Sequence, residues 1–194
     1  PYPFKGLAGV GLAYKLSQAL LRSHAQTPIR NGLAVDLQEG DLLDLVALGT
    51  VADLAPLLDE NRTLVQRGLA RLNRTQRPGL QAMMGVAGAA PGQITSTTIG
   101  FALGPRLNAA GRLDSAMLSY ELLATDDVFK SSQLAGQLNA LNARRQQVTA
   151  EAFEQAQAQI EADGAESLLH VAASEQFLAG IVGLVAGRLV EQYY

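Results

Sequence analysis

The sequence contains no cysteine and no tryptophan, and tyrosine and phenylalanine together make up 5% of the residues. The lack of cysteine excludes disulfide bonds, thiol nucleophiles and cysteine-based zinc sites, and it suits a reducing compartment. So few aromatic side chains leave little for extensive stacking on nucleic-acid bases. No apolar run approaches the roughly 20 residues that a membrane span needs. We therefore expect no membrane partner.

The chain also lacks an N-terminal methionine and the pattern of a signal peptide. It begins PYPFKGLAGVG, with no basic stretch followed by an apolar one, and it ends on LVEQYY. These ends lead us to expect a segment of a longer protein. With 194 residues, 48% of them apolar, the segment is large enough to fold as one domain or as two small ones.

Charges of opposite sign occupy neighbouring blocks of the sequence. Residues 36–60 contain no Lys or Arg, and residues 61–113 contain no acid. The charged residues are Asp36, Glu39, Asp41, Asp44, Asp53, Asp59 and Glu60 in the first block, and Arg62, Arg67, Arg71, Arg74, Arg77, Arg106 and Arg112 in the second. Carboxylates bind cations and guanidinium groups bind phosphate, so the blocks fit an enzyme that uses metal ions on a phosphate substrate. The alternative is two solvated faces that partly pair with each other.

One carboxylate stands in an otherwise apolar stretch. Residues 45–58 read LVALGTVADLAPLL, in which Asp53 is the single charged side chain. Burying an unpaired carboxylate costs several kcal/mol. The residues alone leave four roles open for Asp53: a helix cap, half of an ion pair, a metal ligand, or an exposed side chain.

Helical periodicity dominates the first half of the chain. Apolar residues recur at helical spacing in residues 7–26, and a second helix is expected to follow Asp41 as its N-cap and to end at Pro56. A third is expected to start near Asp59 and to continue to Pro78. Its Arg67, Arg71, Arg74 and Arg77 would form a basic stripe, or an ordinary solvated face.

Further elements are expected in the second half. Helices are predicted at residues 80–86, after a cap at Ser96 or Thr97, at 115–123 and at 178–190. Residues 127–163 are predicted to form one long helix, or two in line, with an end at Asp163-Gly164. Short strands are expected at 33–37, where a loop is the alternative, and at 166–174, where His170 would be a core residue. With a strand followed by a helix at its end, the chain is predicted to be α/β and helix-rich.

Residues 104–113, GPRLNAAGRL, form a second unusual stretch. Two glycines, an asparagine and two arginines six residues apart suit a short connection that binds an anion. The alternative is a glycine-rich turn with two solvated arginines. Residues 85–92, GVAGAAPG, are typical of a linker and are expected to mark a domain boundary.

Four stretches, in the same order, resemble the RecJ-type single-strand-specific DNA exonucleases of the DHH phosphoesterase superfamily. They are PYPFKGLAGVGLAYKLSQAL, DLVALGTVADLAPLLDENRTLVQRGL, GFALGPRLNAAGRLDSA and GIVGLVAGRLVEQYY. The resemblance implies the C-terminal part of a DHH domain at residues 1–58, a connecting helix and linker at 59–92, and part of a DHHA1-like domain at 93–194. The Asp-His-His motif is then expected before Pro1.

The resemblance also implies a chemistry. Two divalent ions, Mn²⁺ or Mg²⁺, would activate water for cleavage of single-stranded DNA from its 5′ end to mononucleotides, in DNA repair and recombination. Asp53 would be a catalytic metal ligand, and Arg106, Asn108 and Arg112 would contact DNA or its terminal phosphate. A cytoplasmic location, a single-strand-binding protein and a helicase are expected in the full-length context.

Two other functions fit the same residues. One is a DHH-type phosphodiesterase that acts on oligoribonucleotides or cyclic dinucleotides. The other is a non-catalytic nucleic-acid-binding module. We expect the segment alone to be inactive, because one carboxylate does not hold two metal ions.

Overall fold

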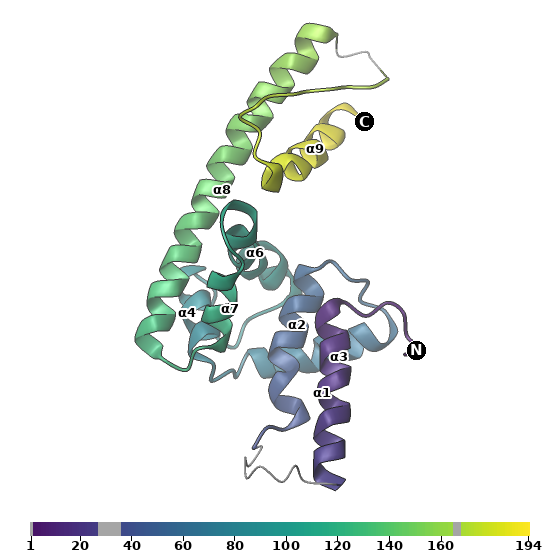
Figure 1. The fold of residues 1–194 in the computed structure, drawn as a ribbon, viewed down its shortest axis with the longest axis vertical. Coiled ribbons are helices and arrows are strands. Elements are labelled where there is room, and N and C mark those ends of the chain that lie inside the picture. The colour runs from purple at the N-terminus through teal and green to yellow at the C-terminus, as the bar shows by residue number, and fades with distance from the viewer. Residues whose placement is uncertain (1, 27–35, 165–167) are drawn as a thin grey trace.

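The computed structural model describes residues 2–26, 36–164 and 168–194, and every regular element in this part of the chain is helical (Figure 1). The elements are α1 (Gly9–Gln26), the 3₁₀ turn η1 (Glu39–Leu42), α2 (Leu43–Ala52), α3 (Asp59–Leu72), α4 (Pro78–Val86), α5 (Ser96–Thr98), the π-helical turn η2 (Ile99–Leu103), α6 (Gly104–Leu113), α7 (Met117–Ala124), α8 (Val128–Asp163) and α9 (Ala179–Tyr193). The helix-rich character is as predicted. Residues 33–35 of the first expected strand lie outside the described residues, and Asp36 and Leu37 belong to no strand.

Helix α2 is buried on most of its circumference. It packs against α1, α3, α6 and η2, which explains why its sequence is apolar all round instead of amphipathic. Glycines permit the close approach of its neighbours. A Cβ on Gly49 would lie 2.8 Å from Val10 of α1, and a Cβ on Gly68 of α3 would overlap the Leu43 carbonyl oxygen. Residues 43–52 therefore form the centre of the N-terminal half.

The start of this helix differs from the prediction. Asp41 does not cap α2; it belongs to η1, where its carboxylate accepts a hydrogen bond from the Gln38 backbone N–H at 2.9 Å. The same carboxylate pairs with Arg71 of α3 at 2.7 Å. A 3₁₀ turn in front of α2 shifts the capping role to the preceding residues, a local detail that helical periodicity does not resolve.

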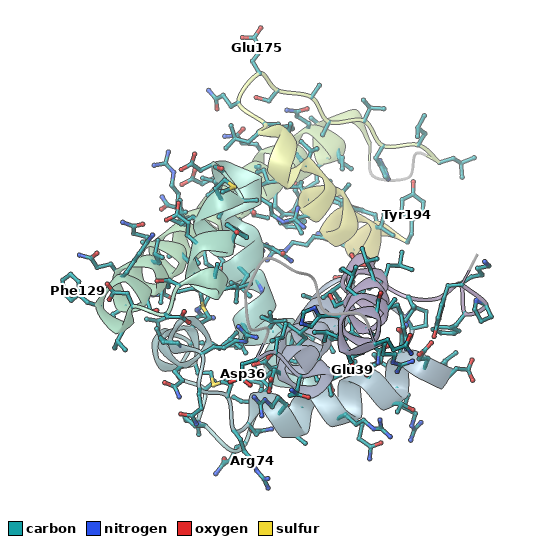
Figure 2. All side chains as sticks on the ribbon, turned by 60° about the horizontal axis from the view of Figure 1, so that its bottom comes forward. Asp36, Glu39, Arg74, Phe129, Glu175 and Tyr194 are labelled. Carbon is teal, nitrogen blue, oxygen red and sulfur yellow. The ribbon has the colours of Figure 1, made fainter. Side chains whose placement is uncertain are left out.

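The predicted basic stripe on one helix is wrong. Helix α3 ends at Leu72, so Arg74 and Arg77 lie beyond it, and Arg77 is the N-cap residue of α4. Arg74 projects outward at the edge of the molecule (Figure 2), whereas Arg77 turns inward to the buried Asp44. The acidic and arginine blocks thus partly pair with each other, as the simpler interpretation of the charge pattern predicted.

The loop after α4 does not separate two cores. Gly88 and Gly92 have positive φ angles of 65° and 85°, which agrees with the loop expected at residues 85–92. One continuous core, however, contains Val65 and Leu80 before this loop and Ile99 and Leu138 after it. The division of the chain into domains at 1–58, 59–92 and 93–194 stays a prediction.

Gly79 of α4 gives the fold a testable contact. A Cβ at this position would overlap the carbonyl oxygen of Leu122 in α7, whereas a Cβ on Gly85 of the same helix would meet nothing within 4 Å. We expect Gly79→Ala to lower the free energy of unfolding by about 2–3 kcal/mol, because overpacking forces the helices apart. The matched Gly85→Ala should raise it by roughly 0.5 kcal/mol through helix propensity. Urea denaturation of both variants measures the difference; equal effects would contradict this packing.

Residues 96–113 form a nearly continuous helical run. Its cap is Thr95, not Ser96 or Thr97: the Thr95 hydroxyl accepts from the Thr98 N–H at 3.2 Å. GPRLNAAGRL is helix α6, not the expected short connection. Gly104 serves close packing, since a Cβ there would lie 3.3 Å from the Cβ of Ala52 in α2, and Pro105 follows it where the π-helical turn passes into α6.

Helix α8 joins two parts of the molecule. Its 36 residues, about 54 Å at 1.5 Å per residue, run along one side of the structure (Figure 1), as one helix that ends at Asp163 with Gly164 as its C-cap residue. Its first half contributes Leu138 to the main core. Its second half packs against α9 in a second core that contains Ala152, Ala156, Ile181 and Val185.

A strand was expected at residues 166–174, and for residues 168–174, which the structure describes, this prediction is wrong. Residues 168–174 form no strand, and Leu168 is 96% exposed. His170 is not a core residue of a strand; its ring lies 5.3 Å from that of Tyr193 and 5.9 Å from that of Tyr194. Helix α9 was expected to pack on this strand; it packs on α8 and α6, and Ala172 of the preceding segment contacts the same core without forming a strand. A short apolar run does not by itself distinguish a strand from a connection.

Candidate metal and phosphate site

Asp53 is the residue that ends α2. Its backbone N–H donates to the Gly49 carbonyl at 3.0 Å, and the next residue, Leu54, has a φ of 56°. The N–H of Leu54 donates to Val51 and that of Ala55 to Thr50, which is the hydrogen-bond pattern of a Schellman motif with leucine in the left-handed position. Non-glycine residues rarely occupy this region, so the turn after Asp53 is strained.

The Asp53 side chain is exposed. Among the described residues, no side chain forms a hydrogen bond or an ion pair with its carboxylate. The sequence left four roles open for Asp53. Of these, the structure shows an exposed side chain and, in the part of the chain that it describes, no ion pair. Asp53 lines a hollow of about 470 Å³, the Asp53 hollow, together with Ala8, Gly9, Val10, Gly49, Ala52 and Asn108.

Asn108 faces this hollow from α6. It is exposed, and it lies in the stretch for which a DNA contact was predicted. The packing of α6 against α2 thus brings two of the predicted site residues, Asp53 and Asn108, to one hollow although 55 positions separate them. An exposed carboxylate without a partner and an amide oxygen are suitable ligands for a hard divalent cation.

The described part of the chain does not hold a complete metal site. No group of three His, Asp or Glu side chains in residues 2–26, 36–164 and 168–194 is placed to bind one ion. Asp53 fits a divalent ion as a single ligand. Two ions would need further carboxylates or imidazoles.

Arg112 lies in the neighbouring hollow. This arginine hollow, of about 190 Å³, shares Ala52 and Asn108 with the Asp53 hollow; its remaining lining is Val51, Leu54, Gly100, Gly104, Pro105, Arg112 and Arg145. Arg112 is exposed, and its Nη1 donates to the Gly180 carbonyl of α9 at 3.0 Å. Gly180 is needed there, because a Cβ would overlap the Arg112 carbonyl oxygen.

Arg106 lies apart from Asp53, Asn108 and Arg112, the other predicted site residues. Its Nε donates to the Asn139 side chain of α8 at 2.9 Å, and its Nη1 donates to the Ala102 carbonyl at 2.7 Å. It lines neither hollow and fastens α6 to α8. Its predicted contact with DNA stays a prediction, as do those of Asn108 and Arg112.

The sequence analysis placed Asp44 in the acidic block but did not predict its burial: it is 1% exposed and binds Arg77. One residue at these hollows was not singled out at all, Arg145, a half-buried arginine on the long helix. Arg145 carries a signal in the sequence. Leu138, Leu141, Arg145 and Val148 follow one another at spacings of three and four, so Arg145 occupies the apolar side of the helix.

A hollow larger than these two is apolar. It has a volume of about 610 Å³ and lies between α2, α6 and α7, with Leu45, Leu48 and Leu107 among its lining residues. Of its polar lining residues, Arg77 is already paired with Asp44 and Ser119 donates to the Leu107 carbonyl. Asn108 reaches it too, but Asp53 does not line it.

The fold matches solved structures of metal-bound exonucleases. The magnesium complex of RecJ from Thermus thermophilus superimposes with a TM-score of 0.81 and 32% identity over 100% of this chain, and the manganese complex with 0.78 and 32% over 95%. A third structure, exonuclease RecJ bound to manganese, gives 0.79 and 31% over 98%. The helical arrangement of this chain is therefore one that these RecJ structures share.

The sequence comparison agrees. The chain is 40% identical over 193 residues to the single-stranded-DNA-specific exonuclease RecJ of Bacillus subtilis (strain 168), and 40% identical over 202 residues to that of Dickeya dadantii (strain 3937). Both alignments cover 100% of this chain, but 23% and 34% of those proteins. No family model matches the sequence. The chain is thus homologous over its whole length to a segment of the RecJ exonucleases and spans a quarter to a third of their length.

In the described ranges, no helix combines the length and the apolar character that crossing a membrane requires.

Proposed function

We propose that this chain is part of a divalent-metal-dependent exonuclease that degrades single-stranded DNA in the 5′→3′ direction to mononucleotides, in DNA repair and recombination. The observation that carries the proposal is the exposed, unpaired Asp53 carboxylate beside Asn108, in a chain homologous to RecJ proteins throughout. Relatives that hold Mn²⁺ or Mg²⁺ share its fold.

Each residue of the proposed site has a separate task. Asp53 supplies a hard anionic oxygen to a divalent ion, which when bound polarises the phosphate and lowers the pKa of water. Asn108, on the wall shared by the two hollows, orients a phosphodiester between them. Arg112 offers a guanidinium to phosphate oxygens, the pairing with the best matched geometry. Arg106, through Asn139, holds α6 in place for these contacts.

The proposal assigns the remaining metal ligands to residues outside the described ones. The 194-residue chain alone is then inactive, because Asp53 by itself does not hold two ions. A cytoplasmic location, a single-strand-binding protein and a helicase as partners belong to the same proposal, by analogy with the function of the RecJ relatives.

The experiment is a hydrolysis assay of the protein that carries this sequence. A 5′-labelled single-stranded oligodeoxynucleotide, the same strand in a duplex, an oligoribonucleotide and a cyclic dinucleotide are each incubated with Mn²⁺ or with EDTA. We expect mononucleotides from the single DNA strand with Mn²⁺ and none with EDTA or from the duplex. Faster cleavage of the oligoribonucleotide or the cyclic dinucleotide would replace the exonuclease by the phosphodiesterase alternative, and no metal-dependent cleavage of any substrate would contradict both.

A further inference from the structure

Arg145 lies at the junction of two hollows. It is on α8 and lines the arginine hollow together with Arg112 of α6. It also lines a hollow of about 340 Å³ between α8 and α9, whose wall includes Arg188. Asn108 joins the arginine hollow to the Asp53 hollow, so the three hollows follow one another from Asp53 to Arg188.

The guanidinium of Arg145 is not satisfied by the protein. Its Nε is buried and has no hydrogen-bond partner, and among the described residues no carboxylate forms an ion pair with it. Buried polar groups in proteins nearly always have a partner, and a charged donor without one is the costliest case. A charged side chain elsewhere on this helix does have partners: the Asp127 carboxylate accepts hydrogen bonds from the backbone N–H groups of Phe129 and Lys130.

The surroundings of Arg145 add to this cost. Burial, then the positive charges of Arg112 and Arg188, lower the pKa of the Arg145 guanidinium. No acid lines the arginine hollow. Glu191 is the one acid on the wall of the hollow between α8 and α9, and it forms no ion pair with Arg145 or Arg188. Three arginines thus converge from three helices without a compensating carboxylate.

Such an arrangement is unfavourable for the protein alone and favourable for an anion. Groups kept in a costly electrostatic environment cluster at binding sites, because the ligand relieves the cost. A phosphate group fits best, since guanidinium groups bind its oxygens bidentately and two of them neutralise its charge. The arginine hollow, at about 190 Å³, has several times the roughly 30 Å³ that one water molecule occupies.

We propose that Arg145 and Arg112 bind one phosphate group of a single nucleic-acid strand in the arginine hollow, and that Arg188 binds a phosphate group further along the same strand. The strand then passes from the Asp53 hollow, where the proposed cleavage takes place, across Asn108 and along the side of α8 that faces α9. The nucleic-acid source of the phosphate rests on the proposed function, whereas the anion site itself does not.

The test compares Arg145→Gln with Arg144→Gln. Arg144 is the adjacent arginine of α8; it is exposed and lines none of the three hollows. Thermal unfolding is followed at constant ionic strength with inorganic phosphate replacing chloride. We expect phosphate to raise the melting temperature of the unchanged protein and of Arg144→Gln, and this rise to be lost in Arg145→Gln and partly kept in Arg145→Lys. Two results would overturn the proposal. In one, phosphate raises the melting temperature of Arg145→Gln as much as that of the unchanged protein; in the other, it raises neither melting temperature.

A second readout uses single-stranded DNA in EDTA, so that binding is measured without cleavage. We expect Arg145→Gln to weaken binding about tenfold, because it removes a hydrogen bond to a charged group. Arg144→Gln should weaken binding less than about twofold. Equal losses in the two variants would overturn the assignment of Arg145. If phosphate protects through Arg145 while no metal-dependent cleavage of DNA is found, the proposed function fails and the anion site stands.

Discussion

Replacement of Asp53 by asparagine is expected to reduce Mn²⁺-dependent hydrolysis of single-stranded DNA by more than about 100-fold in the protein that carries this sequence. Substitutions of residues that merely support metal ligands already cost roughly 10–100-fold, and loss of a ligand should exceed them. Asparagine keeps the shape of the side chain and removes its charge. Because the Asp53 carboxylate is exposed and unpaired, the free energy of unfolding should stay within about 0.5 kcal/mol of the original.

Asp59→Asn is the matched control. Asp59 is also exposed, lies six positions away in the same acidic block and starts α3. Its φ of 44° is one that asparagine tolerates. Steady-state rates and melting temperatures of both variants separate the two cases. Full activity in Asp53→Asn, or an equal loss in Asp59→Asn, would contradict the metal-binding role of Asp53.

The largest expected loss of stability comes from Asp44→Ala. Asp44 is 1% exposed, and its carboxylate accepts hydrogen bonds from the Thr75 hydroxyl at 2.8 Å and from Arg77 Nε at 3.2 Å. Its removal leaves a buried hydroxyl and a guanidinium without their partner. We expect the free energy of unfolding to fall by about 3 kcal/mol. This is the lower end of the range for a broken buried ion pair, because the Arg77 side chain is 30% exposed.

Asp41→Ala provides the comparison for this pair. Asp41 binds Arg71 at 2.7 Å in the same part of the fold, but the two side chains are 31% and 48% exposed. Solvent screening limits such a pair to less than about 1 kcal/mol, and the lost hydrogen bond from the Gln38 N–H adds about 1 kcal/mol at most. Urea denaturation of the two variants, at equal m-values, gives both numbers. Equal losses would show that Asp44 is not the buried partner described above.

The helices that the sequence predicted well are those with strong local signals. Apolar periodicity predicted α1, most of α4 and α9, and it predicted α8 as far as Asp163. These signals act within a few residues of the chain. They do not depend on which elements meet in space.

The errors arise where distant contacts decide the structure. GPRLNAAGRL looked like a short connection because glycine is typical of turns, yet Gly104 lets α2 approach α6, since a Cβ there would lie 3.3 Å from the Cβ of Ala52. The stripe of four arginines was wrong since α3 ends at Leu72 and Arg77 turns to Asp44, which lies 33 positions away. Neither partner is visible in a local sequence window.

The candidate site was predicted in part for the same reason. Asp53 stood out as a lone acid in an apolar stretch, and its exposure at the end of α2 resolves that contradiction. Its neighbour Asn108 depends on the packing of α6 against α2. Arg145 carried a weak signal, an arginine on the apolar side of α8, but its meaning depends on the arginines of two other helices.

Binding of Mn²⁺, followed by the electron paramagnetic resonance signal of the free ion, tests the central claim most directly. The protein that carries this sequence is titrated beside its Asp53→Asn and Asp59→Asn variants. Two bound ions per chain are expected for the original protein and for Asp59→Asn, with at least one of them weakened by more than about tenfold in Asp53→Asn. Unchanged Mn²⁺ binding in Asp53→Asn would contradict the assignment of this carboxylate to the metal site.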